Sequence, residues 1–230
     1  MSQPRNWKSI GLVAVIVLFG IWAIPNIVKS VRDGKVTKGT NLDLVNGNTK
    51  DATSKIISIG KAPAFDLTSS LNQPFSSAQL DGKVYVLEFF FSTCPSICPI
   101  MNKNMQKLEQ RYFGNPNFNL VSITINPSYD TPAVLEDHKA HIGVKGSNWH
   151  FLTGDQKYIY DLAAKFNLYV GQNADAPGGF EHSGLFALVD KDGNIRSRKD
   201  KFGNPKVYYD GTDDAEMQML VEDLTLVLKE

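Results

Sequence analysis

The sequence predicts an α/β domain built as a three-layer sandwich, in which helices cover both faces of a central sheet. Short apolar runs typical of strands alternate with segments in which apolar residues recur at helical spacing. The run at 83–91 lacks a regular polar alternation, as expected of a central strand covered on both faces. The resulting order of strand, helix, strand, helix, hairpin and terminal helix is the order of a thioredoxin-like fold.

The first half of the domain is expected to contain an edge hairpin and two strands joined by a helix. Residues 62–67 and 73–75 resemble the two arms of the hairpin. Residues 118–125 form the strand that follows the 83–91 strand along the chain. Between these two strands, four apolar or aromatic residues at helical spacing indicate a helix: Met101, Met105, Leu108 and Tyr112.

The second half shows three helix starts and three short strands. Asp130 or Thr131 can cap a helix that begins at Pro132, and Asp155 opens another helix. Further strands are expected at 149–152, 185–189 and 194–197. The last helix begins at Asp213 and carries an apolar stripe: Met217, Leu220, Val221, Leu224 and Leu228.

Length and charge limit the classes of function. A chain of 230 residues can bury a sizeable core, and its length suggests one domain once the ends are discounted. The formal net charge is zero, with 24 basic and 24 acidic residues. Bulk composition therefore favours neither nucleic acid nor a strongly charged partner, and local sites must carry the function.

The N-terminal segment is apolar enough to be a membrane anchor. Residues 10–24 carry only apolar side chains and glycine, and a helix over 7–28 would be about 33 Å long. Because no small-residue cleavage site follows at a suitable distance, an uncleaved anchor is favoured over a signal peptide. Basic residues flank both sides, so the positive-inside rule leaves the orientation open, but the short N-terminal arm favours a cytoplasmic N-terminus.

These observations predict three segments. Residues 1–29 form a single-pass anchor in the cytoplasmic (inner) membrane, with the C-terminal domain on the exported, periplasmic side. Residues 30–61 are rich in Gly, Asn, Thr, Lys and Asp and are expected to be a flexible tether with a reach of about 30 Å. Residues 62–230 form the thioredoxin-like domain.

Both cysteines of the chain lie in one stretch, Cys94-Pro-Ser-Ile-Cys98, directly after the 83–91 strand. Their i, i+4 spacing places both sulfurs on one face of the first turn of a helix. Unpaired N–H groups and the helix dipole at that end stabilise thiolates and lower the pKa of cysteine. A disulfide across so short a loop would restrain little chain entropy, so a chemically active pair is the stronger interpretation.

The C-x-x-x-C spacing supports two hypotheses. Thioredoxin-like redox catalysts carry C-x-x-C, in which the second cysteine resolves a mixed disulfide. The extra residue gives a larger bite, which suits two thiolates around a soft ion such as Cu(I) and leaves room for a third ligand. The rival hypothesis is a thiol-disulfide oxidoreductase, in which Cys94 attacks, Cys98 resolves, and both are catalytic.

Four histidines are candidates for the third ligand. His138 and His141 lie three apart on an expected helix and are interpreted as surface residues on a solvated face. His150 enters a short strand and is assigned to packing. His182 lies in an expected flexible loop that leads into the 185–189 strand, and in a thioredoxin-like topology that loop lies beside the cysteine loop. His182 is therefore the predicted third ligand.

With these residues in view, the chain resembles the Sco/SenC family of membrane-anchored copper proteins over 62–230. The resemblance rests on an aromatic strand running into C-P-x-x-C-P at 94–99, the N-P-x-x-D-T-P sequence at 126–132, and the histidine at 182 before a strand. It implies a thioredoxin-like metallochaperone that serves the copper site of cytochrome c oxidase. The implied ligands of Cu(I) or Cu(II) are Cys94, Cys98 and His182.

The resemblance also implies the partners. These are the exported copper-site domain of cytochrome c oxidase or another thiol protein. The N-terminal segment adds the membrane as a partner, and the neutral composition predicts no nucleic acid. Two residues depart from the family pattern: Glu181 stands where Asp often precedes the histidine, and Asn126 stands where Asp-Pro is common. Neither departure removes an implied ligand, although both concern residues that would surround the ligands.

Overall fold

The computed structural model describes residue 25 and residues 56–200 and 202–230. Within these ranges nine strands form one mixed sheet: β1 (Ile56–Lys61), β2 (Asp66–Ser69), β3 (Pro74–Ser76), β4 (Val84–Phe90), β5 (Phe118–Thr124), β6 (Trp149–Thr153), β9 (Leu185–Val189), β10 (Asn194–Arg198) and β11 (Tyr209–Asp210). The order is β1-β10-β9-β4-β5-β6-β2-β3, with β11 paired to β9. β4 pairs in parallel with β5 and antiparallel with β9, so it lies in the middle of the sheet.

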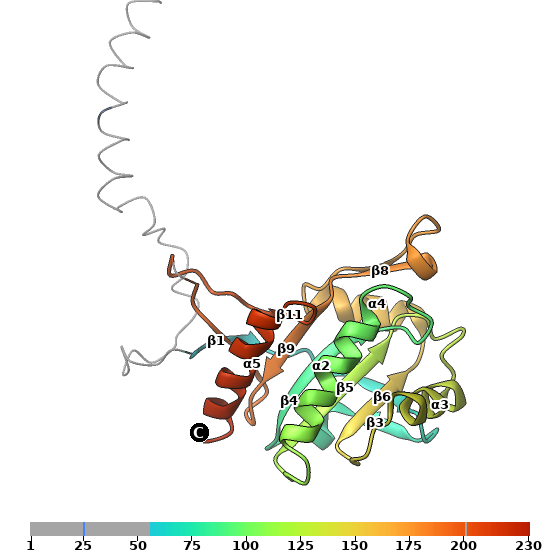
Figure 1. The fold of residues 1–230 in the computed structure, drawn as a ribbon, viewed down its shortest axis with the longest axis horizontal. Coiled ribbons are helices and arrows are strands. Elements are labelled where there is room, and N and C mark those ends of the chain that lie inside the picture. Colours follow the sequence, from blue (N-terminus) through green and yellow to red (C-terminus); the bar gives the residue numbers. More distant parts are fainter. Residues whose placement is uncertain (1–24, 26–55, 201) are drawn as a thin grey trace, which may run out of the picture. The chain divides into compact units, whose positions relative to one another are not determined.

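Helices cover both faces of this sheet: α2 (Cys98–Arg111), α3 (Pro132–Ile142), α4 (Gln156–Lys165) and α5 (Asp214–Val227). Adjacent side chains of β4 point to opposite faces. The ring of Phe90 packs on His138 of α3 at 5.6 Å between centroids, whereas Phe89 packs on Phe166 at the end of α4 at 6.2 Å. Figure 1 shows α2 across β4 and β5, and a hydrogen bond joins the C-terminal end of α2 to α5. The three-layer α/β sandwich is confirmed.

Every residue of β4 is buried, including the acidic Glu88. Ser122 on β5 donates a hydrogen bond of 2.6 Å to one carboxyl oxygen of Glu88, and the indole of Trp149 donates one of 2.9 Å to the same serine hydroxyl. Burial raises the pKa of Glu88 to about 8. The carboxyl group is therefore mostly protonated at neutral pH, which allows an acidic residue to lie in an otherwise apolar layer.

The expected helix starts agree with the structure. Thr131 rather than Asp130 caps α3, because its hydroxyl accepts a hydrogen bond of 3.4 Å from the Val134 N–H. Asp155 and Asp213 cap α4 and α5 in the same way. Side-chain oxygens at these positions satisfy N–H groups that the helix leaves unpaired.

The structure corrects the expected tether at its C-terminal end. The tether was predicted over 30–61, but the last six residues of that range form the strand β1, which pairs antiparallel with β10 and contains a register shift between Ser58 and Gly60. The folded domain therefore includes residues before position 62. Six residues are too few for a pattern to distinguish an edge strand from a coil, because the hydrogen bonds that stabilise the strand come from its partner.

The structure also corrects the flexible loop that was expected before the 185–189 strand. Its residues form a 3-10 turn, η3 (Pro177–Gly179), and a short strand, β8 (Phe180–His182), which pairs antiparallel with β7 (Val170–Gln172). Another 3-10 turn, η2 (Ser77–Leu80), precedes β4. The hairpin β7–β8 is separate from the main sheet. His182 therefore has a hydrogen-bonded backbone instead of a free loop.

The predicted anchor at 1–29 and the predicted tether up to residue 55 lie outside the described residues, apart from Pro25. Among the residues that the structure describes, no helix combines the length and the apolar character needed to cross a bilayer.

Candidate metal centre

The cysteine loop follows the buried strand β4 directly. Because β4 ends at Phe90 and α2 begins at Cys98, the chain must turn within a few residues, and the Cys94 N–H donates a hydrogen bond of 3.2 Å to the Phe91 carbonyl. Pro99 occupies the first turn of α2, where its missing N–H costs no helical hydrogen bond. Cys98 is thus held at the start of a helix, and Cys94 lies in the loop before it.

Asp130 fixes the start of this loop from a neighbouring segment. Its carboxyl oxygens accept hydrogen bonds from the Ser92 N–H, at 3.1 Å, and from the hydroxyls of Ser92 and Thr124. Asp130 is fully buried, so each of these donors depends on it. Sequence patterns indicate Asp130 only as a helix cap and give no signal for this role, because the contact joins residues 38 positions apart.

His182 approaches from the β7–β8 hairpin. Its backbone pairs with Val170, and the next N–H, that of Ser183, donates a hydrogen bond of 3.1 Å to the Tyr169 carbonyl. The ring packs edge-on against Phe91 of the cysteine loop, with 6.0 Å between centroids. Phe180 also packs against the ring of Phe91, with 5.3 Å between centroids. An aromatic contact therefore seats the hairpin on the cysteine loop.

The hairpin also needs a glycine where it meets the loop. Gly178 has φ +79°, and a Cβ at this position would lie 2.8 Å from the ring of Phe91 and 3.2 Å from Cδ of Pro95. A larger residue would therefore separate the two segments, and its backbone would be strained as well.

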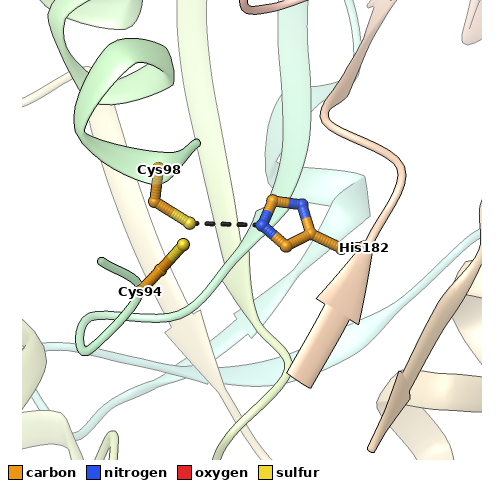
Figure 2. A group of neighbouring side chains, drawn as sticks. All are labelled: Cys94, Cys98 and His182. Atoms are coloured by element: carbon orange, nitrogen blue, oxygen red, sulfur yellow. Dashed lines mark hydrogen bonds between the residues drawn. The ribbon is translucent and has the colours of Figure 1, made fainter. Parts of the chain in front are cut away.

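The three predicted ligands converge. The sulfurs of Cys94 and Cys98 and a ring nitrogen of His182 all lie within 4.8 Å of one another. Figure 2 shows the two sulfurs and the imidazole edge directed toward a common point, and Cys98 Sγ shares a hydrogen bond of 3.2 Å with His182 Nε2. Cys94 is 7% exposed and Cys98 2%. The structure thus brings together residues that are 84 positions apart in the sequence.

A cavity of about 140 Å³ opens beside the site. Its lining includes Cys94 and His182 but not Cys98. Apolar side chains form much of its wall: Phe91, Ile97, Ala176, Pro177 and Phe180. An incoming group would therefore reach Cys94 or His182 before Cys98.

The two thiols have opposite electrostatic surroundings. A hydrogen bond from the Cys98 thiol lowers the pKa of Cys94, and bonds from His182 and from the backbone N–H groups of Cys98 and Ser96 lower it further, against the opposing effect of burial. The same pairing with Cys94, together with burial, raises the pKa of Cys98. Cys94 is therefore the thiol that ionises first.

The donor set fits a soft metal ion. Two sulfurs and one imidazole nitrogen are the ligands that suit Cu(I), and imidazole and thiolate also bind Cu(II). Ligand atoms at about 2–2.3 Å from a first-row ion lie about 4 Å from each other, a spacing that the observed separations permit. His182 Nδ1 is buried without a hydrogen-bond partner among the described residues. The carboxyl group of the adjacent Glu181 accepts hydrogen bonds from the Tyr169 hydroxyl and the Asn173 amide instead.

The other histidines lie apart from the site. His141 is exposed, as predicted. His138 is half-buried between Phe90 and Phe151, so its assignment to a solvated face was wrong. Apolar periodicity did not reveal this, because the α3 face that carries His138 is covered by side chains from α2 and the sheet. His150 packs on Phe75 and shares a hydrogen bond with Asn119, as expected of a packing residue.

Fold and site together define a thioredoxin-like protein with a Cys-Cys-His centre at a helix N-terminus. The profile of the SCO1/SenC family matches residues 58–215. The chain belongs to the SCO1/SenC family.

Individual relatives agree with this placement. The chain is similar to the SCO1 protein homolog of Bacillus subtilis, with 30% identity over 137 residues that cover 59% of this chain and 70% of the relative. It matches the solved structure of BsSco with a TM-score of 0.63 and 24% identity, covering 75% of this chain and 96% of that one. Yeast Sco1 with copper bound matches with a TM-score of 0.53 and 24% identity, covering 74% and 90%. The chain spans about two thirds of the length of its bacterial relatives.

Removing the Asp130 side chain should destabilise the domain. In Asp130→Ala, the Ser92 N–H and two hydroxyls lose their buried acceptor, which is expected to lower the free energy of unfolding by about 3 kcal/mol. Urea unfolding of the reduced full-length chain measures this. Asp200→Ala is the matched control, because Asp200 also accepts three hydrogen bonds but is exposed. Equal effects of the two substitutions would contradict a special role for Asp130.

Titration of the thiols should show the asymmetry of the pair. A lowered pKa means that Cys94 remains a thiolate at pH values where an ordinary cysteine, with a pKa of about 8.5, is protonated. Thiolate absorbance near 240 nm should therefore persist in the reduced chain below that pH. Cys98→Ala removes the largest stabilising hydrogen bond and should shift the transition to higher pH, while His141→Ala should leave it unchanged. A transition that is the same in all three chains would refute the assignment.

Proposed function

We propose that this protein holds copper through Cys94, Cys98 and His182 and delivers it during assembly of the copper site of cytochrome c oxidase. The observation that carries the proposal is the convergence of two buried sulfurs and one imidazole nitrogen within 4.8 Å. The relatives support it: BsSco is described as a member of the Sco family of cytochrome c oxidase assembly proteins, and yeast Sco1 has been solved with copper bound.

Each residue has a distinct part in holding and releasing the ion. Cys98 lies deepest and outside the cavity, whereas Cys94 and His182 line it. Transfer proceeds by ligand exchange, in which a thiol or imidazole of the recipient enters the cavity and replaces Cys94 or His182 first. Cys98 is the last ligand to be exchanged. Because Cys94 ionises first, a thiolate is available to bind the ion without strongly alkaline conditions.

A second candidate function is reduction of a partner's disulfide, and the unequal pKa values of the two thiols favour it. The Cys94 thiolate would attack a partner disulfide, form a mixed disulfide and release one partner thiolate. Cys98 would lose its proton and attack Cys94, releasing the second partner thiol and leaving a Cys94–Cys98 disulfide. Each turnover then needs an external dithiol reductant. Among the described residues no peptide bond is cis, so the cis-proline that thioredoxin-type catalysts place near the cysteines has no counterpart here.

We also propose that residues 1–29 anchor the chain in the cytoplasmic membrane and that the segment before β1 tethers the copper domain on the periplasmic side. The apolar run at 10–24 supports this. In spheroplasts, added protease should degrade the C-terminal domain while the inner membrane is intact. Protection until the membrane is lysed would place the domain in the cytoplasm and overturn the proposal.

Substitution of His182 should strongly weaken copper binding while the fold persists. Anaerobic titration of the reduced chain is expected to give one Cu(I) per protein, and His182→Ala should bind at least tenfold more weakly because one of three ligands is lost. His141→Ala is the control, since His141 is exposed and is not one of the three clustered residues. Equal affinity in the wild type and His182→Ala would exclude His182 as a ligand.

The same samples separate the two candidate functions. A disulfide-reductase assay with dithiol reductant is run with and without copper. One tightly bound copper with negligible turnover supports delivery of the metal, whereas catalytic turnover in the copper-free chain supports reduction.

A further inference from the structure

The backbone that carries His182 is held on two sides. On the hairpin side, the Ser183 N–H bonds to the Tyr169 carbonyl. On the core side, Gly184 has φ +67°, and its carbonyl accepts a hydrogen bond of 2.8 Å from the Gly211 N–H. The backbone beside His182 is therefore linked to Gly211 as well as to the hairpin.

Gly211 is held by the helix that carries Cys98. The side chain of Asn104 on α2 donates a hydrogen bond of 2.8 Å from Nδ2 to the Gly211 carbonyl. Asn104 is 2% exposed. A continuous path thus runs from α2 through Asn104 and Gly211 to Gly184, two residues after His182.

Neighbouring groups fix the orientation of this amide. Lys107 Nζ donates a hydrogen bond of 2.9 Å to Asn104 Oδ1. Because an ammonium group can only donate, the oxygen must face Lys107, and Nδ2 must face Gly211. A Cβ on Gly211 would lie 2.7 Å from the ring of Phe186, so this close approach needs glycine. Both partners of the contact are therefore constrained: Lys107 orients the Asn104 amide, and the ring of Phe186 requires glycine at position 211.

We propose that Asn104 is a positioning residue that sets the separation between Cys98 and His182 and thereby tunes the affinity and geometry of the copper site. Cys98 and Asn104 lie on one helix, about 9 Å apart along its axis, so a shift of the helix at Asn104 moves Cys98 with it. The inference rests on the proposed copper function. The hydrogen bonds of the Asn104 side chain go to Gly211 and Lys107 and not to a proposed ligand, so Asn104 acts through Gly211 and Gly184.

Asn102 offers a matched control on the same helix. It is 7% exposed, and its Nδ2 lies 3.3 Å from His138 Nε2 on α3, away from the Gly211 path. Asn104→Asp and Asn102→Asp both keep the size of a buried side chain and remove an amide donor. Asn104→Asp leaves the acceptor for Lys107 in place but turns a second oxygen toward the Gly211 carbonyl.

The test compares these variants in the full-length, detergent-solubilised chain. Cu(I) affinity is measured by competition with a chromophoric chelator, and the thiolate-to-Cu(II) charge-transfer band reports the geometry of the site. Asn104→Asp is expected to weaken binding about 10–100-fold, as for other residues that orient metal ligands, and to shift the band. Asn102→Asp should do neither. Equal changes in both variants, or no change in Asn104→Asp, would overturn the proposal.

Two measurements on the copper-free chain keep the inference separate from the copper function. In Asn104→Asp, the Gly211 amide should exchange with solvent faster and the NMR signals of the His182 ring should shift, whereas Asn102→Asp should leave both unchanged. Unaltered His182 signals in Asn104→Asp refute the positioning role even if copper binds. A wild-type chain that binds no copper refutes the proposed function instead. If Asn104→Asp does not fold, Asn104→Ala removes the donor without adding a repulsive oxygen and is read in the same way.

Discussion

Burial of β4 between helices on both sides is the constraint on which the site depends. All seven residues of this strand are buried, and β5 and β9 pair with it on either side, so neither its register nor its direction can change without exposing the core. The C-terminal end of β4 is therefore fixed in position, and the cysteine loop begins there. The location of the two sulfurs is thereby set by a fully buried strand that is paired on both sides.

The loop between β4 and α2 is short of regular hydrogen bonds, and the structure supplies support from elsewhere. The Asp130 carboxyl group satisfies the donors at the start of the loop, and Phe91 packs under the β7–β8 hairpin. These contacts replace the backbone ladder that a strand or helix would have. Buried thiols in such a loop keep a defined separation because the residues around them have few alternative positions.

The pair of thiols shows how one geometry can support two chemistries. A thiol with a lowered pKa next to a buried thiol with a raised pKa suits both binding of a soft ion and attack on a disulfide. The imidazole of His182 distinguishes them in structural terms, since it adds a third donor atom directed at the two sulfurs. A reductase does not need that atom, whereas a copper site gains a ligand from it.

Local patterns in the sequence were sufficient to predict the alternating strands and helices, the helix starts at Asp155 and Asp213, and the position of Cys98 at a helix start. They left Asp130 and Thr131 open as caps of α3, and the structure selected Thr131. These features depend on neighbours within a turn or a strand, and hydrophobic periodicity records them. His182 was predicted as a ligand only by combining the local sequence pattern with the thioredoxin-like topology, which places its loop beside the cysteines. Its loop was then found to be the strand β8, and His138 was found to be half-buried.

By itself, the sequence determined the class of fold and the nearness of the two sulfurs, because a separation of four residues beside a helix start keeps them close, although only Cys98 lies on the helix. Only the tertiary structure decided how His182 reaches Cys98, how Asp130 secures the loop and how Asn104 is linked to the His182 strand. It also decided that β1 joins the sheet. Each of these contacts joins segments far apart in the chain, and their partners are selected by packing and hydrogen bonding in the folded core, which no local pattern encodes.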